Sequence, residues 1–135
     1  MKNIIASFAI FAIVILSATF SIKYLNNVCG KLEGLSIEIE NNIQSEQWNK
    51  SYDSSLKFLN DWNKYSKKIS VFTHHEKIDN INNELWKLTQ YVKEKNKDES
   101  LASIHVIKCL LNHIVEMERI NLQNIFWKTV KIFYN

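Results

Sequence analysis

The chain has 135 residues, the length of one domain, with only two glycines and no proline. Because sheet proteins rely on Gly and Pro in their turns, this composition argues against a sandwich or barrel and favours an all-helical fold. Gly30 and Gly34 both lie soon after an N-terminal apolar run, which leaves no glycine-rich loop for a phosphate or dinucleotide. The formal charge of +3 owes much to Lys2 and Lys23, and residues 24–135 carry 15 basic and 14 acidic groups. We therefore expect no nucleic-acid partner.

The first predicted element is a membrane anchor in residues 1–23. Residues 4–22 carry no charge, and a helix of that length spans about 28 Å, close to the ~30 Å hydrocarbon core of a bilayer. A cleaved signal peptide is the alternative, but its apolar core is usually only about 7–15 residues long, and the segment Ser17–Thr19 matches a cleavage site poorly. We expect a retained anchor that contacts membrane lipid through residues 4–22.

The distribution of lysines does not decide the orientation of this anchor. Lys2 and the amino terminus on one side stand against Lys23 and Lys31 on the other. A short tail before an apolar helix is typical of a signal anchor, which leaves the tail in the cytosol. We therefore expect a single-pass protein of the cell membrane with residues 24–135 outside the cytoplasm.

Residues 24–45 form the predicted juxtamembrane helix, which we expect to continue the anchor outward. Its apolar residues recur at steps of three and four, as on one helix face. They are Leu32, Leu35, Ile39 and Ile43. Ser45, three residues before Trp48, is the predicted N-cap of the next helix. The bundle domain is expected to occupy residues 46–135.

The second predicted helix carries an aromatic stripe. The tripeptide Trp-Asn-Lys at Trp48 recurs at Trp62, two heptads later, which places both indoles on nearly the same face. Core packing is the expected role of these indoles, and an aromatic ligand cage is the alternative. Lys64, Lys67 and Lys68 form a local basic cluster, which usually indicates a solvated face.

The third and fourth predicted helices have clear apolar seams. Thr73 and Glu76 form a predicted capping box, and Asp98 is the predicted cap of the fourth helix. The two seams are Ile78, Ile81, Leu85, Leu88 and Val92, then Leu101, Ile104, Ile107, Leu111, Ile114 and Met117. An irregularity is expected near Asn121. Because the connections are short, neighbouring helices must be antiparallel. The predicted fold is all-α, an N-terminal transmembrane helix followed by an antiparallel bundle of three to four helices.

His105, Cys109 and His113 are candidate metal ligands because their spacing of four residues places successive pairs on one helix face. The outer two lie about 12 Å apart along the axis, so a second helix would have to supply further ligands. Cys109 has the neighbours of a small buried hydrophobe. We therefore expect no metal and no cofactor. An external domain would permit, without requiring, a disulfide between Cys29 and Cys109.

His75 and Asp79 belong to the densest polar cluster, and the antiparallel arrangement brings Glu118 to the same end of the bundle. One interpretation is a charge-assisted pair of His75 with Glu118 that fixes helix register. The other, which we favour, is capping, with acids complementing the helix dipole. Nothing supplies an oxyanion hole or a paired-carboxylate cleft, so we expect no enzymatic activity.

The order and spacing of several residues resemble a family of small uncharacterised proteins from spore-forming Gram-positive bacteria, known only as a domain of unknown function. The similarity covers most of the chain: the anchor, Trp48, Trp62, His75, Asp79, Ile81, Ile114, Glu116, Glu118, Asn124 and Ile125. It implies a membrane-anchored helical domain outside the cytoplasmic membrane with no known activity, substrate or cofactor. It also implies a partner subunit that accompanies another small membrane protein.

Three hypotheses about function follow. In the first, the bundle is an accessory or protein-interaction component of the cell envelope whose partner is another membrane or envelope protein. In the alternative, it is a ligand or metal sensor that uses the histidine-bearing end of the bundle. A third hypothesis concerns residues 121–135, whose aromatic and basic composition also occurs in helices that lie in a membrane interface. Core packing is the interpretation that we favour for that segment.

Overall fold

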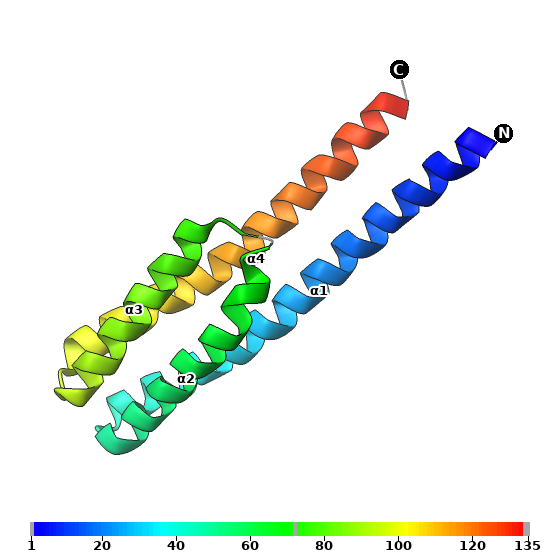
Figure 1. Cartoon of the computed structure of the whole chain (residues 1–135). Helices are drawn as coiled ribbons and strands as arrows, with labels where there is room; N and C mark the ends of the chain where they lie inside the picture. The colour runs from blue at the N-terminus through cyan, green and yellow to red at the C-terminus, as the bar shows by residue number, and fades with distance from the viewer. Residues whose placement is uncertain (1, 72, 134–135) are drawn as a thin grey trace.

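The computed structural model describes the backbone of residues 2–71 and 73–133 and the side chains of residues 4–71, 73–117, 119, 120 and 124. Within these ranges the chain forms four α-helices that pack as a bundle (Figure 1). They are α1 (Lys2–Gln44), α2 (Trp48–Ile69), α3 (His75–Lys93) and α4 (Lys97–Phe133). The predicted all-α bundle with a long apolar helix at the N-terminal end is confirmed.

The predicted anchor and the predicted juxtamembrane segment form one uninterrupted helix. α1 has 43 residues, which corresponds to about 64 Å at ~1.5 Å per residue. Its first half is largely exposed, whereas its second half buries one face in the bundle. The buried apolar residues of that face are Leu25, Val28, Cys29, Leu32, Ile39 and Ile43. The helix of the apolar segment therefore continues through the predicted juxtamembrane residues as far as Gln44.

The predicted N-cap at Ser45 is wrong, because Ser45 still belongs to the end of α1. Its amide bonds to a carbonyl of the preceding turn at 3.0 Å. Glu46 then adopts a left-handed conformation with φ 57°, and the amide of Gln47 closes the turn onto Asn42 O at 2.8 Å. α2 begins at Trp48 without a side-chain cap from Gln47.

The predicted capping box of Thr73 and Glu76 is also wrong. The amide of Thr73 donates to Ile69 O at 3.1 Å, so Thr73 remains tied to the end of α2. His74 occupies the N-cap position in an extended conformation, and its side chain makes no capping hydrogen bond. Glu76 lies in the first turn of α3, where its charge complements the helix dipole.

The cap of α4 is Asn96, not the predicted Asp98. The side-chain Oδ1 of Asn96 accepts a hydrogen bond from the amide of Glu99 at 3.3 Å. Lys95 is left-handed, with φ 58°, and the amide of Asn96 donates to Tyr91 O at 2.9 Å. This turn therefore repeats the geometry of the α1–α2 turn.

The core lies where the helices contact one another in the order α1, α2, α3 and α4, with α4 returning to α1. Trp62 and Phe58 of α2 are fully buried, and the predicted seam of α3 is buried from Ile78 to Val92. Trp48 packs against this core in a half-buried position, so the core role of both indoles is confirmed. Fully buried small residues such as Ser36, Ser51, Ser55 and Ser100 let the helices approach closely.

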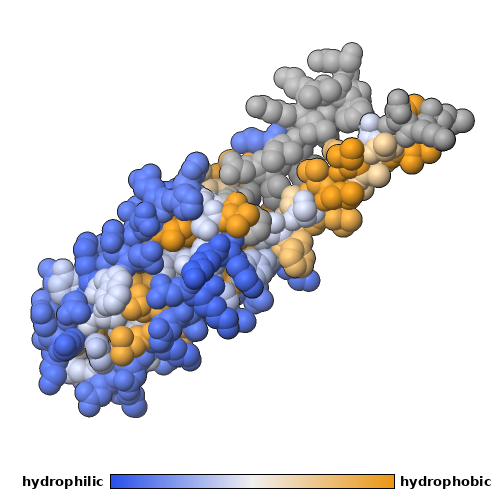
Figure 2. All heavy atoms as spheres, viewed as in Figure 1, coloured by the Kyte–Doolittle hydropathy of each residue, from blue (hydrophilic) through white to orange (hydrophobic). Residues whose placement is uncertain are grey.

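Two helices project beyond the α2–α3 pair at the same end of the molecule, where both chain termini lie (Figure 1). One is the first half of α1 and the other is the last part of α4. α4 continues without a break through Asn121, so the predicted irregularity there is wrong. Apolar residues follow the projecting part of α1, whereas the bundle surface is mostly hydrophilic (Figure 2).

Candidate membrane anchor and contact surfaces

The first half of α1 has the properties that contact with lipid requires. Phe8 and Phe20 are 75% and 74% exposed. Among the described helices, α1 is the one long and apolar enough to cross a membrane, and none of its most apolar window is buried by the other described residues. The hydroxyls of Ser17, Thr19 and Ser21 donate to carbonyls of the preceding turn at 2.8 to 3.1 Å. These groups therefore need no water, and the segment fits a signal anchor or a signal sequence.

The candidate metal ligands His105, Cys109 and His113 all lie exposed on α4. Cys109 is thus not the buried hydrophobe expected from its neighbours. Nε2 of His105 lies 3.4 Å from Oε1 of Glu40 on α1, and Lys108 donates to the other oxygen of that carboxylate at 2.8 Å. Over the residues that the structure describes, no group of three or more His, Cys, Asp and Glu side chains is arranged to hold a metal ion.

The polar cluster at the start of α3 is exposed. His75 and Asp79 both face solvent in its first turns. The side chain of Glu118 lies outside the described residues, and with it the predicted pair of His75 and Glu118. The structure therefore brings neither His75 nor Asp79 into a buried site.

The two cysteines have opposite environments, and neither forms a disulfide. Cys29 lies on the buried face of α1, in the core of the bundle, and is 5% exposed. Burial, and secondarily the charge of Glu33, raises the pKa of its thiol to about 11. Cys109 is exposed on α4, so only Cys109 is accessible to reagents in solution.

A second apolar stripe on α4 was missed in the sequence. Val106, Met117 and Ile120 are 44%, 38% and 51% exposed, although Met117 was assigned to the core seam. We name as the outer face of α4 the residues Ala102, Val106, Cys109, His113, Met117 and Ile120. Their steps of three and four residues place them on one face, pointing away from the core seam. The spacing of these residues in the sequence could have revealed the outer face. The apolar seam of the core lies in the same segment and is the stronger pattern.

A shallow surface pocket of about 260 Å³ borders this face between α3 and α4. It is lined by Asn80, Asn83, Glu84, Lys87, Val106 and Leu110. Lys87 pairs with Glu84 at 2.8 Å on its rim. Val106 belongs both to the pocket and to the outer face of α4, so the two form a continuous surface with a polar edge.

The predicted interfacial tail, residues 121–135, continues α4 as far as Phe133. Within the tail, the side chain of Asn124 is described and is exposed. The remaining tail side chains, on which both the interfacial and the core interpretations depend, lie outside the described residues.

Comparison with known proteins identifies the family of the chain. A family model described as Domain of unknown function (DUF4363) matches residues 19–125, from the end of the apolar segment into the projecting part of α4. No curated protein and no solved structure matches the chain. Since the family model covers well over half of the sequence, the chain belongs to the DUF4363 family, as its resemblance to a domain of unknown function had indicated.

Proposed function

We propose that the chain is a single-pass membrane protein whose helical bundle lies outside the cytoplasm and binds another membrane or envelope protein, without catalysing a reaction. The observation that carries this proposal is the division of α1 into two halves. The first half is apolar and exposed along a length that can cross a bilayer. The second half is built into the core of the bundle.

The continuity of α1 supports retention of the anchor. A helix that passes without a break from the apolar segment to Leu25 and Val28 holds the bundle close to the membrane and at a defined height. A folded domain that follows an apolar helix has the arrangement of a signal anchor, for which the following domain is translocated. Labelling of Cys109 in intact cells directly tests the placement of the bundle outside the cytoplasm.

The outer face of α4 is the surface that we assign to the partner. It combines exposed apolar side chains with a neighbouring pocket whose edge is polar, the composition expected of a protein contact surface. Most lysines and acids elsewhere on the bundle are exposed, and the described side chains offer no arrangement of nucleophile, base and oxyanion donors on which a reaction could be argued.

Site-specific photocrosslinking in intact membranes tests this assignment. A photoreactive residue at position 117 of the full chain should give one discrete adduct, because Met117 lies on the proposed surface. The additional substitution Val106→Glu should abolish the adduct, since it places a charge in the apolar contact. A photoreactive residue at Asn60, exposed on α2, is the matched control.

The outcomes separate clearly. An adduct at 117 that disappears with Val106→Glu and is absent at 60 supports the proposal, whether the partner is another protein or a second copy. No adduct at 117, or equal adducts at 60 and 117, would refute the assignment of the outer face of α4.

A further inference from the structure

The end of α2 lies at the level where the apolar part of α1 ends. Nζ of Lys68, in the last turn of α2, is 6.0 Å from the centroid of the Tyr24 ring on α1. Tyr24 follows the uncharged segment 4–22 by two residues. If that segment spans a bilayer, Tyr24 lies at the headgroup level, where tyrosines are enriched. Lys68 is then held at the same height by the packing of α2 on α1.

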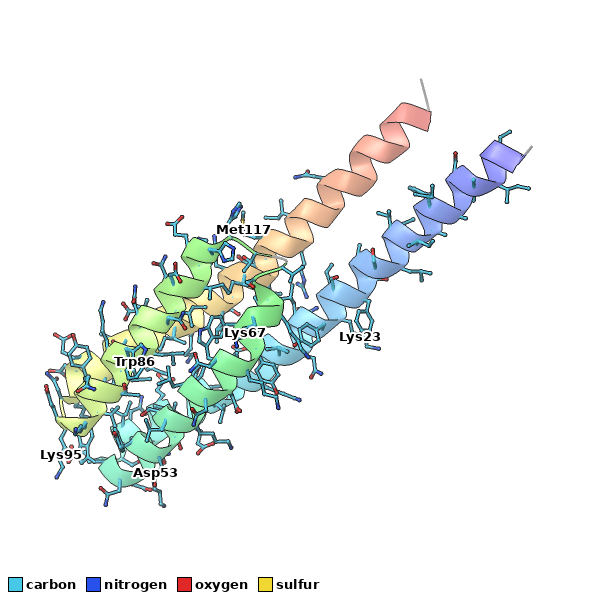
Figure 3. All side chains as sticks on the ribbon, in the orientation of Figure 1. Lys23, Asp53, Lys67, Trp86, Lys95 and Met117 are labelled. Atoms are coloured by element: carbon cyan, nitrogen blue, oxygen red, sulfur yellow. The ribbon has the colours of Figure 1, made fainter. Side chains whose placement is uncertain are left out.

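A basic surface surrounds this point. Lys64, Lys67 and Lys68 are exposed and share one face of α2, because they are three and four residues apart. Lys23 is exposed on α1 beside Tyr24. We name these four residues the basic shoulder. Figure 3 shows Lys23 and Lys67 toward the end from which α1 projects, with Asp53 and Lys95 at the opposite end.

The charges of the basic shoulder are not neutralised within the described chain. Ion pairs there involve other lysines, at positions 87, 97 and 108. Lys64 and Lys68 instead approach the rings of Tyr65 and Tyr24. The nearby acids are Asp61 on α2 and Glu76 and Asp79 in the first turns of α3. On α2, the three lysines of the basic shoulder therefore stand against one acid within a turn of them, Asp61.

An exposed apolar residue adjoins the basic shoulder. Val71, three residues after Lys68 in the α2–α3 connection, is 77% exposed. Basic side chains next to an exposed apolar one are the combination that binds the surface of an anionic membrane, through headgroup attraction and shallow insertion. The cluster read as a solvated face in the sequence therefore faces the bilayer if α1 spans it.

We propose that the basic shoulder docks on the anionic lipid headgroups of the leaflet from which α1 emerges, with Val71 entering the interface. This proposal rests on the retained membrane span of the proposed function. Docking fixes the tilt of the bundle, because α2 then touches the membrane on one side of α1. Lys50 and Lys57 lie on the same face of α2 but about 16 Å or more from Lys68 along the helix at ~1.5 Å per residue, beyond the ~8–10 Å over which charge acts at ordinary salt.

Depth-dependent quenching in reconstituted vesicles tests the proposal on the full chain. An environment-sensitive fluorophore is attached at Val71→Cys with Cys109 replaced by Ser, and the quencher is a lipid labelled near its headgroup. Vesicles contain phosphatidylcholine alone or a mixture with phosphatidylglycerol. We expect quenching in the anionic vesicles to be about twofold or more that in the vesicles of phosphatidylcholine alone. This difference should disappear near ~1 M salt, where the screening length falls to ~3 Å.

The charge variants supply the matched comparison. Lys64→Glu with Lys67→Glu should remove the additional quenching, whereas Lys50→Glu with Lys57→Glu, the same change on the same helix face, should retain it. Circular dichroism of both variants checks that the helices remain folded. Equal quenching in the two kinds of vesicle, or equal loss in the two double variants, would overturn the docking proposal.

A second probe position separates this outcome from failure of the proposed function. A fluorophore at Ile13→Cys, within the apolar half of α1, should be quenched by lipids labelled in their acyl chains whatever the headgroup. Quenching at Ile13→Cys without charge-dependent quenching at Val71→Cys would refute docking alone. Absence of quenching at Ile13→Cys would refute the membrane span, and the docking proposal with it.

Discussion

Trp62 is the largest fully buried side chain, and its indole nitrogen has one polar partner in the described chain. Nε1 of Trp62 donates to Oδ1 of Asn82 on α3 at 2.6 Å. We expect Asn82→Ala to lower the free energy of unfolding by about 1–3 kcal/mol, because the buried N–H loses its acceptor. Chemical denaturation of the full chain in detergent micelles, followed by circular dichroism, measures the change.

The control for this prediction is Asn83→Ala, at the neighbouring exposed position. Its effect should stay within about 0.5 kcal/mol, as is usual for surface substitutions. Equal effects of the two substitutions would show that the hydrogen bond to Trp62 is not what makes Asn82 important.

The two thiols should differ in reactivity by a large factor. With its pKa raised to about 11 by burial, Cys29 has about a hundredfold less thiolate near neutral pH than a thiol with the ordinary pKa of 9.0. Cys109 is exposed. We expect a maleimide to modify only Cys109 in the native chain and both cysteines after denaturation, as counted by intact mass. A native Cys109→Ser chain that still reacts would contradict this.

The thiol of Cys109 also reports the orientation of the protein. Treatment of intact cells with a membrane-impermeant maleimide should label Cys109 if the bundle lies outside the cytoplasm. The mass of the labelled chain should include residues 1–22 if the anchor is retained. Protection of Cys109 until the cells are lysed would place the bundle in the cytoplasm and refute that part of the proposed function.

At the scale of elements, both turns at the far end of the bundle place a non-glycine residue in a left-handed conformation. Lys95 has φ 58° at the end of α3, where glycine is the preferred residue. We expect Lys95→Gly to raise the free energy of unfolding by about 1 kcal/mol, since the strain of a side chain in this conformation disappears. Lys93→Gly, within the last turn of α3, should instead lower it by about 1 kcal/mol. Thermal melts of both variants provide the test, and a destabilising Lys95→Gly would contradict it.

Periodicity predicted the helices and their buried faces because the spacing of apolar residues on one helix face is visible within a short stretch of sequence. The seam of α3 is buried from Ile78 to Val92, as its spacing indicated. The caps were not predictable in the same way. Whether Ser45 or Gln47 precedes α2 depends on how α1 ends, and the left-handed Glu46 that closes that turn carries no glycine signal.

The contact surfaces were harder to predict from the sequence than the fold. The Glu40–Lys108 bond joins residues 68 positions apart, and no local pattern indicates such a pair. The role proposed for the basic shoulder depends on Lys68 lying beside Tyr24, which only the packing of α2 on α1 reveals. Cys109 was misplaced because its sequence neighbours are apolar, although they point to other faces of α4.

At the scale of the whole molecule, the two halves of α1 differ in what surrounds them in the described chain. Within the described part of the chain none of its most apolar window is buried, whereas its second half contributes to the core and binds α4 through Glu40. The bundle should therefore not need the proposed membrane span for folding. It should, however, need the part of α1 that begins at Leu25.

Two truncations test this division. We expect a chain without residues 1–22 to unfold cooperatively with undiminished helicity in its remaining residues, because every buried apolar side chain is retained. Removal of residues 1–32 also deletes Leu25, Val28 and Leu32, which are buried in the core. At about 1.5–3 kcal/mol for each such side chain, the loss approaches the ~5–15 kcal/mol that stabilises a typical domain. We expect the shorter chain to lose its cooperative transition in circular dichroism melts, and failure of the longer chain to fold would show that the bundle depends on its membrane segment.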